Sequence, residues 1–327
     1  MKEPVVVIKD LKKYYSSKNG TVNAVNGVNL QVQAGEVFGF LGPNGAGKTT
    51  TLRILTTLLT PDSGDAFVAG FDVKKNPDQV RRSIGYVSQA GGADMPATGR
   101  ENLILQAKLY GMKAKVASAR ADELIKLMEL SEFADRIVYT YSGGQRRRLD
   151  VALGLLNHPS ILFLDEPTTG LDPQNRANLW EQIEKLKSEG TTIFITTHYL
   201  EEADALCDRL AIIDNGKIVA EGTPEELKKQ VAGECITISF ENFGEKAPRL
   251  ISVLEKCEFM RKIKSGEGIL RLYVNDGAKA ITEIIRILTE QEIVLTTISL
   301  SAPSLDDVFF SQTGHSLRDI NAKGDEK

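Results

Sequence analysis

The chain has 327 residues, of which 42% are hydrophobic and 26% charged, and its formal net charge is −4 with a pI near 5.6. This length gives room for two domains, the composition is that of an ordinary soluble globular protein, and the acidic balance argues against a general nucleic-acid binder. Cys207, Cys235 and Cys257 form neither a metal pattern nor a disulfide framework, which favours a reducing cytoplasm.

The first part of the chain predicts a small antiparallel β region. Residues 5–8 are a β-branched run, residues 22–32 alternate in polarity, and Ala34-Gly35-Glu36 is a turn signal. Tyr14 and Tyr15 lie in this region. One of these rings could stack on an adenine, and the alternative is a plain aromatic residue of a sheet.

The most informative stretch matches the pattern G-x-x-x-x-G-K-[ST] and consists of Gly42-Pro43-Asn44-Gly45-Ala46-Gly47-Lys48-Thr49. It follows an apolar strand, residues 37–41, and precedes a helix-forming run that begins at Thr50. The glycines let successive N–H groups point into one concavity, where these donors and the helix N-terminus attract phosphate. Lys48 is expected to reach the β- and γ-phosphates and the Thr49 hydroxyl to bind Mg²⁺. The stretch predicts a nucleoside triphosphate site, but it does not separate a kinase, a GTPase, a helicase and a transporter motor.

The segments after this loop predict further strands and a helical insert. The helix is expected to end near Leu59, ahead of Pro61. A strand over residues 83–89 ends in Gln89, and Gly91-Gly92-Ala93 is expected to loosen the chain there. Residues 100–130 have helical spacing of their leucines.

Ser142 and Gln145 form a capping box, so a helix is predicted to start at Ser142. Gly143 and Gly144 leave the backbone of its first turn bare, which suits the close approach of a second phosphate group. An ordinary capped helix is the alternative. The arginines at 146–148 predict a solvated or salt-bridged face.

Two apolar strands then end in polar residues. Residues 161–164 lead into Asp165 and Glu166, at the end of a strand where α/β sheets bind ligands. Asp165 is placed to hold Mg²⁺, and Glu166 is the better general base, with Pro167 favouring an extended backbone at Glu166. The strand over residues 193–197 ends in His198, and residues 211–219 predict a hairpin.

Together these pieces resemble the ATPase subunit of an ATP-binding cassette (ABC) transporter over about residues 4–230. The resemblance implies an α/β fold: a P-loop cassette with a RecA-like core, an antiparallel β subdomain and a helical subdomain at about residues 90–160. It makes Gln89 the Q-loop glutamine, Asp172 the D-loop aspartate and His198 the switch histidine. Tyr15 fits the adenine-stacking position, and the signature is Ser142-Gly143-Gly144-Gln145. A mild departure is Tyr141, where leucine is commonest.

The family also implies cofactors and a mechanism. ATP and Mg²⁺ are expected, with the metal held by Thr49, Gln89 and Asp165, and catalysis is expected from Glu166, His198, Gln89 and Lys48. Two cassettes pack head to tail, so that ATP on one P-loop is capped by the signature helix of the other. Glu166 polarises the attacking water, His198 contacts the γ-phosphate, and Gln89 reports the nucleotide state.

The expected partners are a separate multi-span membrane permease and a second cassette, for which a copy of this chain is favoured although an unlike cassette stays open. No apolar run approaches the ~20 residues of a membrane span and no signal peptide is predicted, so the permease would hold the chain at the cytoplasmic face of the cell membrane. No nucleic acid is expected. The rival is a soluble ABC ATPase acting on ribosomes or DNA. Such proteins usually carry two cassettes or a long coiled-coil insertion, and this chain shows neither. The cargo is not named by the sequence.

Residues 233–316 predict a separate α+β domain, after a cassette at residues 1–232 and before a disordered tail at 317–327. Alternating and helical spacings give the order strand, helix, strand, helix, strand, and residues 224–230 form a short capped helix before it. This domain resembles the extension of drug-resistance-type exporter ATPases, notably at Pro303-Ser304-Leu305-Asp306-Asp307-Val308-Phe309. A regulatory or dimer-stabilising role is expected.

Overall fold

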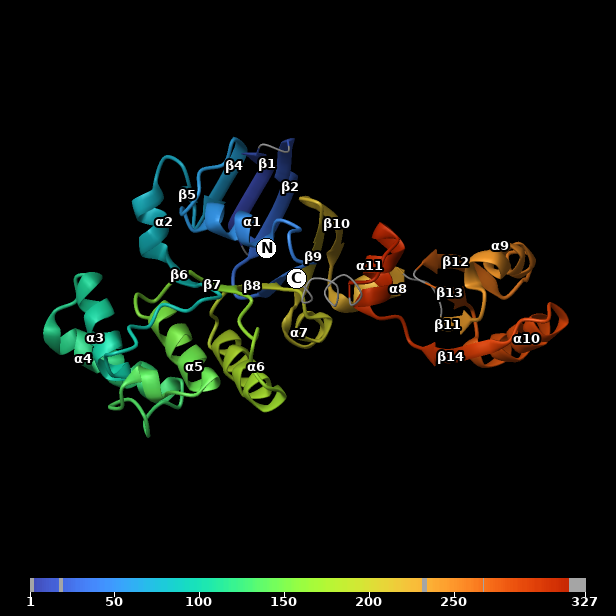
Figure 1. Ribbon diagram of the computed structural model, residues 1–327. Coiled ribbons are helices and arrows are strands. Elements are labelled where there is room, and N and C mark those ends of the chain that lie inside the picture. Colours follow the sequence, from blue (N-terminus) through green and yellow to red (C-terminus); the bar gives the residue numbers. More distant parts are fainter. Residues whose placement is uncertain (1–2, 18–19, 231–233, 267, 318–327) are drawn as a thin grey trace. The chain divides into compact units, whose positions relative to one another are not determined.

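The computed structural model describes residues 3–17, 20–230, 234–266 and 268–317, and the chain divides into two compact units, Met1–Ile218 and Val219–Lys327 (Figure 1). The first unit contains a mostly parallel sheet, an antiparallel sheet and a group of helices, and the second contains a small antiparallel sheet with its own helices. The predicted α/β cassette with an added α+β domain is confirmed in this architecture.

The parallel sheet forms the core of the first unit. Its six strands run in the order β10-β9-β3-β8-β7-β6, with the bounds β3 Val37–Leu41, β6 Ile84–Val87, β7 Ile161–Asp165, β8 Ile193–Thr197, β9 Arg209–Asp214 and β10 Lys217–Gly222. The pairs β6–β7, β7–β8, β8–β3 and β3–β9 are parallel. Every residue of β3, β7 and β8 is buried, as expected for strands covered on both faces. The carboxyl ends of β7, β8 and β3 therefore meet at one edge of the sheet.

The predicted antiparallel region is the second sheet of this unit. Its strands run in the order β2-β1-β4-β5, with the bounds β1 Pro4–Ser17, β2 Gly20–Gln33, β4 Ser63–Val68 and β5 Phe71–Asp72. Helix α1, Lys48–Leu55, contacts strands of both sheets, and one hydrophobic cluster spans the three elements. In Figure 1, α1 and the antiparallel sheet lie on one side of the parallel sheet, and α5, α6 and α7 lie on the other.

Helix α1 ends at Leu55, earlier than the predicted end near Leu59. Thr57 adopts a left-handed conformation with φ 62°, its N–H donates to the carbonyl of Ile54, and the N–H of Leu58 donates to the carbonyl of Arg53. This pair of bonds is a Schellman motif, which satisfies the last carbonyls and stops the helix. The sequence did not predict this helix end, because glycine is the usual residue in the left-handed position and this chain has a threonine there.

Helices fill the predicted insert and the rest of the first unit. Their bounds are α2 Pro77–Ser83, α3 Gly99–Leu109, α4 Ala114–Leu127, η1 Val138–Thr140, α5 Gly143–Gly154, α6 Pro173–Ser188 and α7 Leu200–Leu206. The helical run predicted over residues 100–130 is divided, with Gly111 at φ 85° between α3 and α4. Within the described ranges, no helix combines the length and apolarity needed to cross a membrane.

The second unit is a four-stranded antiparallel sheet in the order β12-β13-β11-β14. Its elements are α8 Pro224–Gln230, β11 Glu234–Phe240, α9 Phe243–Leu254, β12 Met260–Gly266, β13 Ile269–Val274, α10 Gly277–Glu290, β14 Leu295–Ser301 and α11 Leu305–Thr313. The predicted strand, helix, strand, helix, strand order lacked β12 and α11. Strand β12 is a partly exposed edge strand, so it carries little of the alternation by which strands are predicted.

The division between the units falls after Ile218, because α8 packs against α11. The boundary proposed after residue 232 and residues 318–327 of the proposed tail lie outside the described residues. Leu317, which was assigned to that tail, is buried, and its N–H donates to Asp306 Oδ1 at 3.0 Å.

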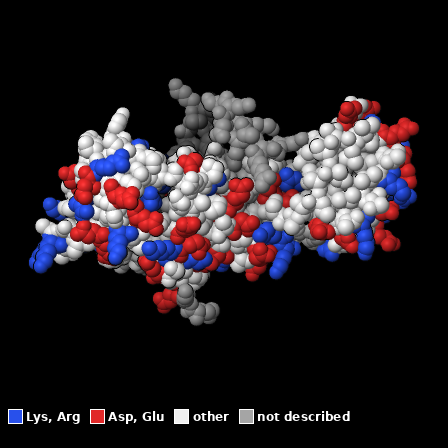
Figure 2. Space-filling model, turned by 90° about the horizontal axis from the view of Figure 1, so that it is seen from below, with Lys and Arg blue, Asp and Glu red and all other residues white. Residues whose placement is uncertain are grey.

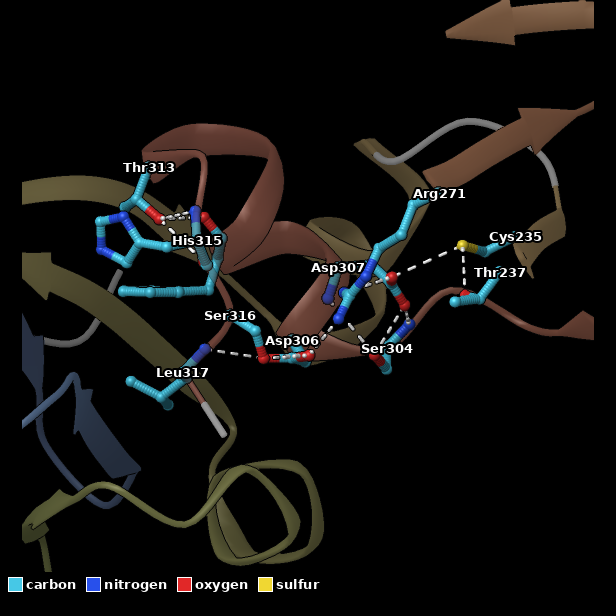
Figure 3. A network of polar contacts seen from close by, with 11 residues as sticks. Cys235, Thr237, Arg271, Ser304, Asp306, Asp307, Thr313, His315, Ser316 and Leu317 are labelled. Carbon is cyan, nitrogen blue, oxygen red and sulfur yellow. Dashed lines mark hydrogen bonds and ion pairs between the residues drawn. The ribbon is translucent and has the colours of Figure 1, made fainter. Parts of the chain in front are cut away.

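A buried polar network holds α11 onto the sheet of this unit (Figure 3). Arg271 of β13 donates from Nη1 to Asp307 Oδ1 and from Nη2 to Asp306 Oδ2, both at 3.0 Å. Ser304 caps the helix through Asp307, and the Ser316 hydroxyl donates to Asp306. The guanidinium also lies over the ring of Phe310, at 4.5 Å from its centroid. The side chains of Arg271, Asp306 and Asp307 are at most 10% exposed. Ion pairs and hydrogen bonds within the protein therefore take the place of their hydration by water.

Replacing Arg271 by methionine is expected to destabilise this unit by ~3–5 kcal/mol, because two buried carboxylates lose their cation. Hydrogen exchange of the β11 and β13 amides in the full-length chain measures the loss. The matched control is Arg286→Met, since Arg286 also pairs with two carboxylates but on the exposed face of α10. It should leave the exchange unchanged. Equal effects of the two substitutions would show that the network does not hold the unit together.

Candidate functional site

The glycine-rich loop joins β3 to α1 and is packed tightly on two sides. A Cβ added at Gly42 would lie 2.3 Å from the carbonyl oxygen of Ile213, and one added at Gly47 would lie 2.2 Å from that of Ala24. Gly47 is also the N-cap of α1, with φ 107°. Asn44 and Gly45 form the exposed tip of the loop, whereas Pro43 and Ala46 are buried and Thr49 and Thr50 half-buried. Glycine is thus required at Gly42 and Gly47 by the close approach of neighbouring backbone.

Lys48 is buried beneath this loop, with 4% of its side chain exposed. Its Nζ donates to the carbonyl oxygens of Gly42 and Pro43, at 2.7 and 3.1 Å, and lies 3.3 Å from Glu166 Oε1. Burial lowers the pKa of Lys48, and the charges of Glu166 and Asp165 oppose that shift. The ammonium group is therefore held at the inner side of the predicted phosphate loop.

Asp165 ends β7 and faces Thr49 across the sheet edge. Its Oδ1 accepts from the Thr196 hydroxyl at 2.6 Å and from the Thr49 hydroxyl at 3.3 Å. Burial raises the pKa of Asp165, the bond from Thr196 counteracts this, and the charge of Glu166 adds to it. A carboxylate beside a hydroxyl is the hard oxygen donor set that Mg²⁺ prefers, so these residues fit the expected metal.

Glu166 is the centre of the site, because side chains from four segments converge on its carboxylate. Gln89 Nε2 donates to Oε2 at 3.2 Å and Thr169 Oγ1 at 3.3 Å, His198 Nδ1 lies 3.2 Å from the same oxygen, and Lys48 approaches Oε1. Burial alone would raise the pKa of Glu166, but the contact with His198 and the charge of Lys48 lower it to about 2. Glu166 is therefore ionised at neutral pH and can accept a hydrogen bond from a water molecule.

The backbone at Glu166 differs from the prediction. Its φ is 45°, in the left-handed region rather than the extended region that Pro167 favours. The N–H of Glu166 lies 3.1 Å from both the carbonyl oxygen and the hydroxyl of Thr196, and this contact holds the turn. Strained backbone of this kind is common at functional sites, where the surrounding contacts maintain it.

The signature residues lie at the start of α5, and their glycines pack against the segment that contains Asp172. Ser142 is the N-cap and forms the predicted capping box with Gln145. A Cβ added at Gly144 would lie 2.1 Å from Asn175 Oδ1, and one added at Gly143 would lie 3.5 Å from Leu171 Cδ2. Asp172 in turn caps α6 by accepting from the N–H of Asn175 at 2.9 Å. The structure thus groups the signature with the D-loop, and groups Lys48, Thr49, Gln89, Asp165, Glu166 and His198 with one another.

Tyr15 lies on β1, opposite Val22 of β2, and its side chain is 43% exposed. The carbonyl of Ala24, two residues along β2 from Val22, is the one packed against Gly47. The ring is therefore partly exposed on a sheet that borders the glycine-rich loop.

Arg147, Thr169 and Thr196 contact the site and were not predicted. Arg147 was expected on a solvated face, but its side chain is buried and donates to the carbonyl oxygens of Ser88, Pro167 and Asp165 at 2.7, 2.8 and 3.0 Å. Its spacing from Gly144 and Val151, three and four residues away on the buried face of α5, was the available signal. Thr196, which binds Asp165, had only its position at the end of an apolar strand to distinguish it.

Comparisons with known proteins agree with this geometry. Residues 25–169 match a family model described as ABC transporter, and residues 222–313 match one described as ATP-binding protein DrrA1-3-like, C-terminal domain. The daunorubicin resistance ATP-binding protein DrrA2 of Streptomyces coeruleorubidus is 42% identical over 314 residues, 96% of each chain. The daunorubicin/doxorubicin resistance ATP-binding protein DrrA of Streptomyces peucetius is 44% identical over 306 residues, 92% of this chain and 91% of its own.

Among solved structures, a dimeric ATP-binding cassette in a post-hydrolysis state bound to ADP and Pi is similar, with a TM-score of 0.61 and 29% identity. It covers 67% of this chain and 98% of its own. The similarity to the resistance proteins thus extends through both units of this chain, whereas the solved cassette matches about two thirds of it.

Proposed function

Because the chain belongs to the ABC transporter family, as one of its ATP-hydrolysing subunits, we propose that it powers the export of a substrate through a separate membrane permease. The observation that carries this proposal is the convergence of Lys48, Gln89 and His198 on one ionised carboxylate, Glu166, at the edge of the parallel sheet. The names of the resistance proteins support export, since they describe ATP-binding proteins that confer drug resistance.

The residues of this cluster divide the work of hydrolysis. Backbone N–H groups of the glycine-rich loop and the helix N-terminus attract the phosphates, and Lys48 neutralises their charge. Glu166 orients and polarises the attacking water, His198 contacts the γ-phosphate, and Gln89 senses whether that phosphate is present. Most of the rate enhancement then comes from positioning and charge stabilisation.

Mg²⁺ would be held by Thr49, Asp165 and Gln89, whose donors are all oxygen atoms. It would supply positive charge that stabilises the phosphates during hydrolysis. The contact between Thr49 and Asp165, at 3.3 Å, supports this assignment because it puts two of the three donors side by side.

A second copy of this chain is the proposed partner cassette. Ser142 and Gly143 are exposed at the start of α5, so the N–H of Gly143, which the capping box does not use, is available to phosphate of another subunit. Asp172 would line the same interface, Gln145 would support the helix start, and the exposed ring of Tyr15 would stack on adenine. The domain at residues 233–316 is proposed to regulate or stabilise the pair.

The permease assignment places the chain at the cytoplasmic face of the cell membrane. Its test is purification of tagged Glu166→Gln protein from native membranes, solubilised in mild detergent with ATP and Mg²⁺, with ADP as the control. We expect a multi-span protein in stoichiometric amount. Recovery only with ribosomal or DNA-repair components would overturn the assignment and favour a soluble ABC ATPase. That rival would need a basic surface, and acidic and basic side chains are interspersed on the face drawn in Figure 2.

A further inference from the structure

The loop that carries Gln89 is bound by α5 at both of its ends. Before Gln89, Arg147 Nη1 donates to the carbonyl oxygen of Ser88 at 2.7 Å. After it, the N–H groups of Gly92 and Ala93 donate to Asp150 Oδ1 at 2.9 and 3.2 Å. In the segment at residues 91–93, which was expected to loosen the chain, one carboxylate thus satisfies two backbone amides.

Arg147 also binds the backbone on both sides of Glu166. Its Nη2 donates to the carbonyl oxygen of Asp165 at 3.0 Å and its Nε to that of Pro167 at 2.8 Å. One guanidinium thus fixes the backbone next to Gln89 and the backbone next to Glu166. Between these anchors, Gln89 Nε2 donates to Glu166 Oε2 at 3.2 Å.

The pair is built into the protein rather than placed on its surface. Arg147 is 7% exposed and Asp150 is 5% exposed, and they stand one turn apart on α5. Burying charged side chains is costly unless each is paired and hydrogen-bonded. Burial lowers the pKa of Arg147 and raises that of Asp150, and the charge of each opposes the shift of the other. The hydrogen bonds of both side chains go to backbone groups of the Gln89 loop or of the Glu166 turn.

We propose that Arg147 and Asp150 are positioning residues that clasp the Gln89 loop to the end of β7 and so set the contact between Gln89 and Glu166. Because the signature residue Ser142 is the N-cap of α5, the same helix links the end that caps the partner's nucleotide to the Gln89 loop of this chain's own site. The rise of an α-helix separates Ser142 from Asp150 by ~12 Å. This linkage rests on the proposed pairing of two cassettes, whereas the clasp itself rests on the contacts within one chain.

The clasp predicts a specific kinetic effect. The glycine-rich loop and Lys48 have no part in it, so ATP should bind normally when it is broken. Small displacements of catalytic groups can cost up to ~10²-fold in rate. We therefore expect Asp150→Ala to lower kcat about tenfold with KM for ATP within about twofold, which is a loss of transition-state stabilisation alone. Asp150→Asn, which keeps an oxygen acceptor for Gly92 and Ala93, should retain more of the rate.

A substitution in the Gln89 loop, with two control variants, tests the contact between this loop and Asp150. A Cβ at Gly91 would lie 2.6 Å from Asp150 Oδ2, so Gly91→Ala should displace the carboxylate and reproduce the fall in kcat. Gly92→Ala keeps its N–H and meets nothing within 4 Å, so it should not change kcat. Gly111→Ala controls for backbone strain, since Gly111 shares the positive φ of Gly91, 85° against 79°, but meets nothing within 4 Å.

Hydrogen exchange of the Gly92 and Ala93 amides, measured without nucleotide, distinguishes a role of Asp150 in positioning the loop from a role in the stability of the whole fold. Exchange should accelerate at these amides in Asp150→Ala and Gly91→Ala, while the amides of β7 stay protected. Unchanged kcat in a folded Asp150→Ala protein, or equal losses in all three glycine variants, would overturn the proposal. So would a loss confined to KM. Failure of the export proposal is visible elsewhere, in the absence of a permease from the purified complex, and would leave these kinetic results standing.

Discussion

Replacing Glu166 by glutamine is expected to slow ATP hydrolysis by ~10²–10⁴, the usual loss when a general base is removed, while ATP still binds. Glutamine keeps the size of the side chain, but it cannot carry the negative charge that accepts a proton from the attacking water. The wild-type carboxylate has a pKa of about 2, so it is ionised throughout the pH range of an ordinary assay. Steady-state phosphate release, with ATP affinity measured separately, gives the result.

The matched control for this variant is Glu36→Gln. Glu36 is also partly buried and charge-paired in the first unit, where it contacts Arg209, but it lies at the start of β3 rather than at the carboxyl ends of the strands. Hydrolysis should be nearly unchanged in the control. If Glu166→Gln turned over ATP at the wild-type rate, the assignment of Glu166 to the attacking water would be wrong.

Replacing Lys48 by alanine is expected to act on binding instead. Hydrogen bonds to charged groups contribute ~1.5–3 kcal/mol, so losing the ammonium should weaken ATP binding by about 10- to 100-fold. The loop would also lose the two bonds from Nζ to the carbonyls of Gly42 and Pro43. Titration calorimetry measures the affinity. Lys75→Ala, which removes a lysine exposed at 81%, is the control. Normal affinity in Lys48→Ala would contradict the phosphate-cradle assignment.

The parts of the site that the sequence predicts are those where a motif and a strand end coincide. Asp165 and His198 stand at the ends of β7 and β8, and the glycine-rich loop that carries Lys48 begins directly after β3. Parallel strands bring such ends together at one sheet edge. The convergence on Glu166 follows from that topology. What periodicity does not give is the left-handed backbone of Glu166, because it depends on the contact of its N–H with Thr196.

Arg147 and Asp150 show a different limit of sequence reasoning. A run of three arginines after a glycine-rich helix start is usually solvated, and the burial of Arg147 depends on carbonyl groups supplied by β7 and the Gln89 loop. In the second unit, likewise, Arg271 lies within a strand whose alternation is regular, and its partners on α11 come 35 and 36 residues later. Long-range polar pairs of this kind leave no local pattern.

The mass of Glu166→Gln protein in solution shows whether ATP is bound between two copies of this chain. With slow hydrolysis, ATP and Mg²⁺ should hold the pair closed, so light scattering should give twice the chain mass of 35.8 kDa, and ADP should give the single-chain mass. A single-chain mass at saturating, bound ATP would contradict the account.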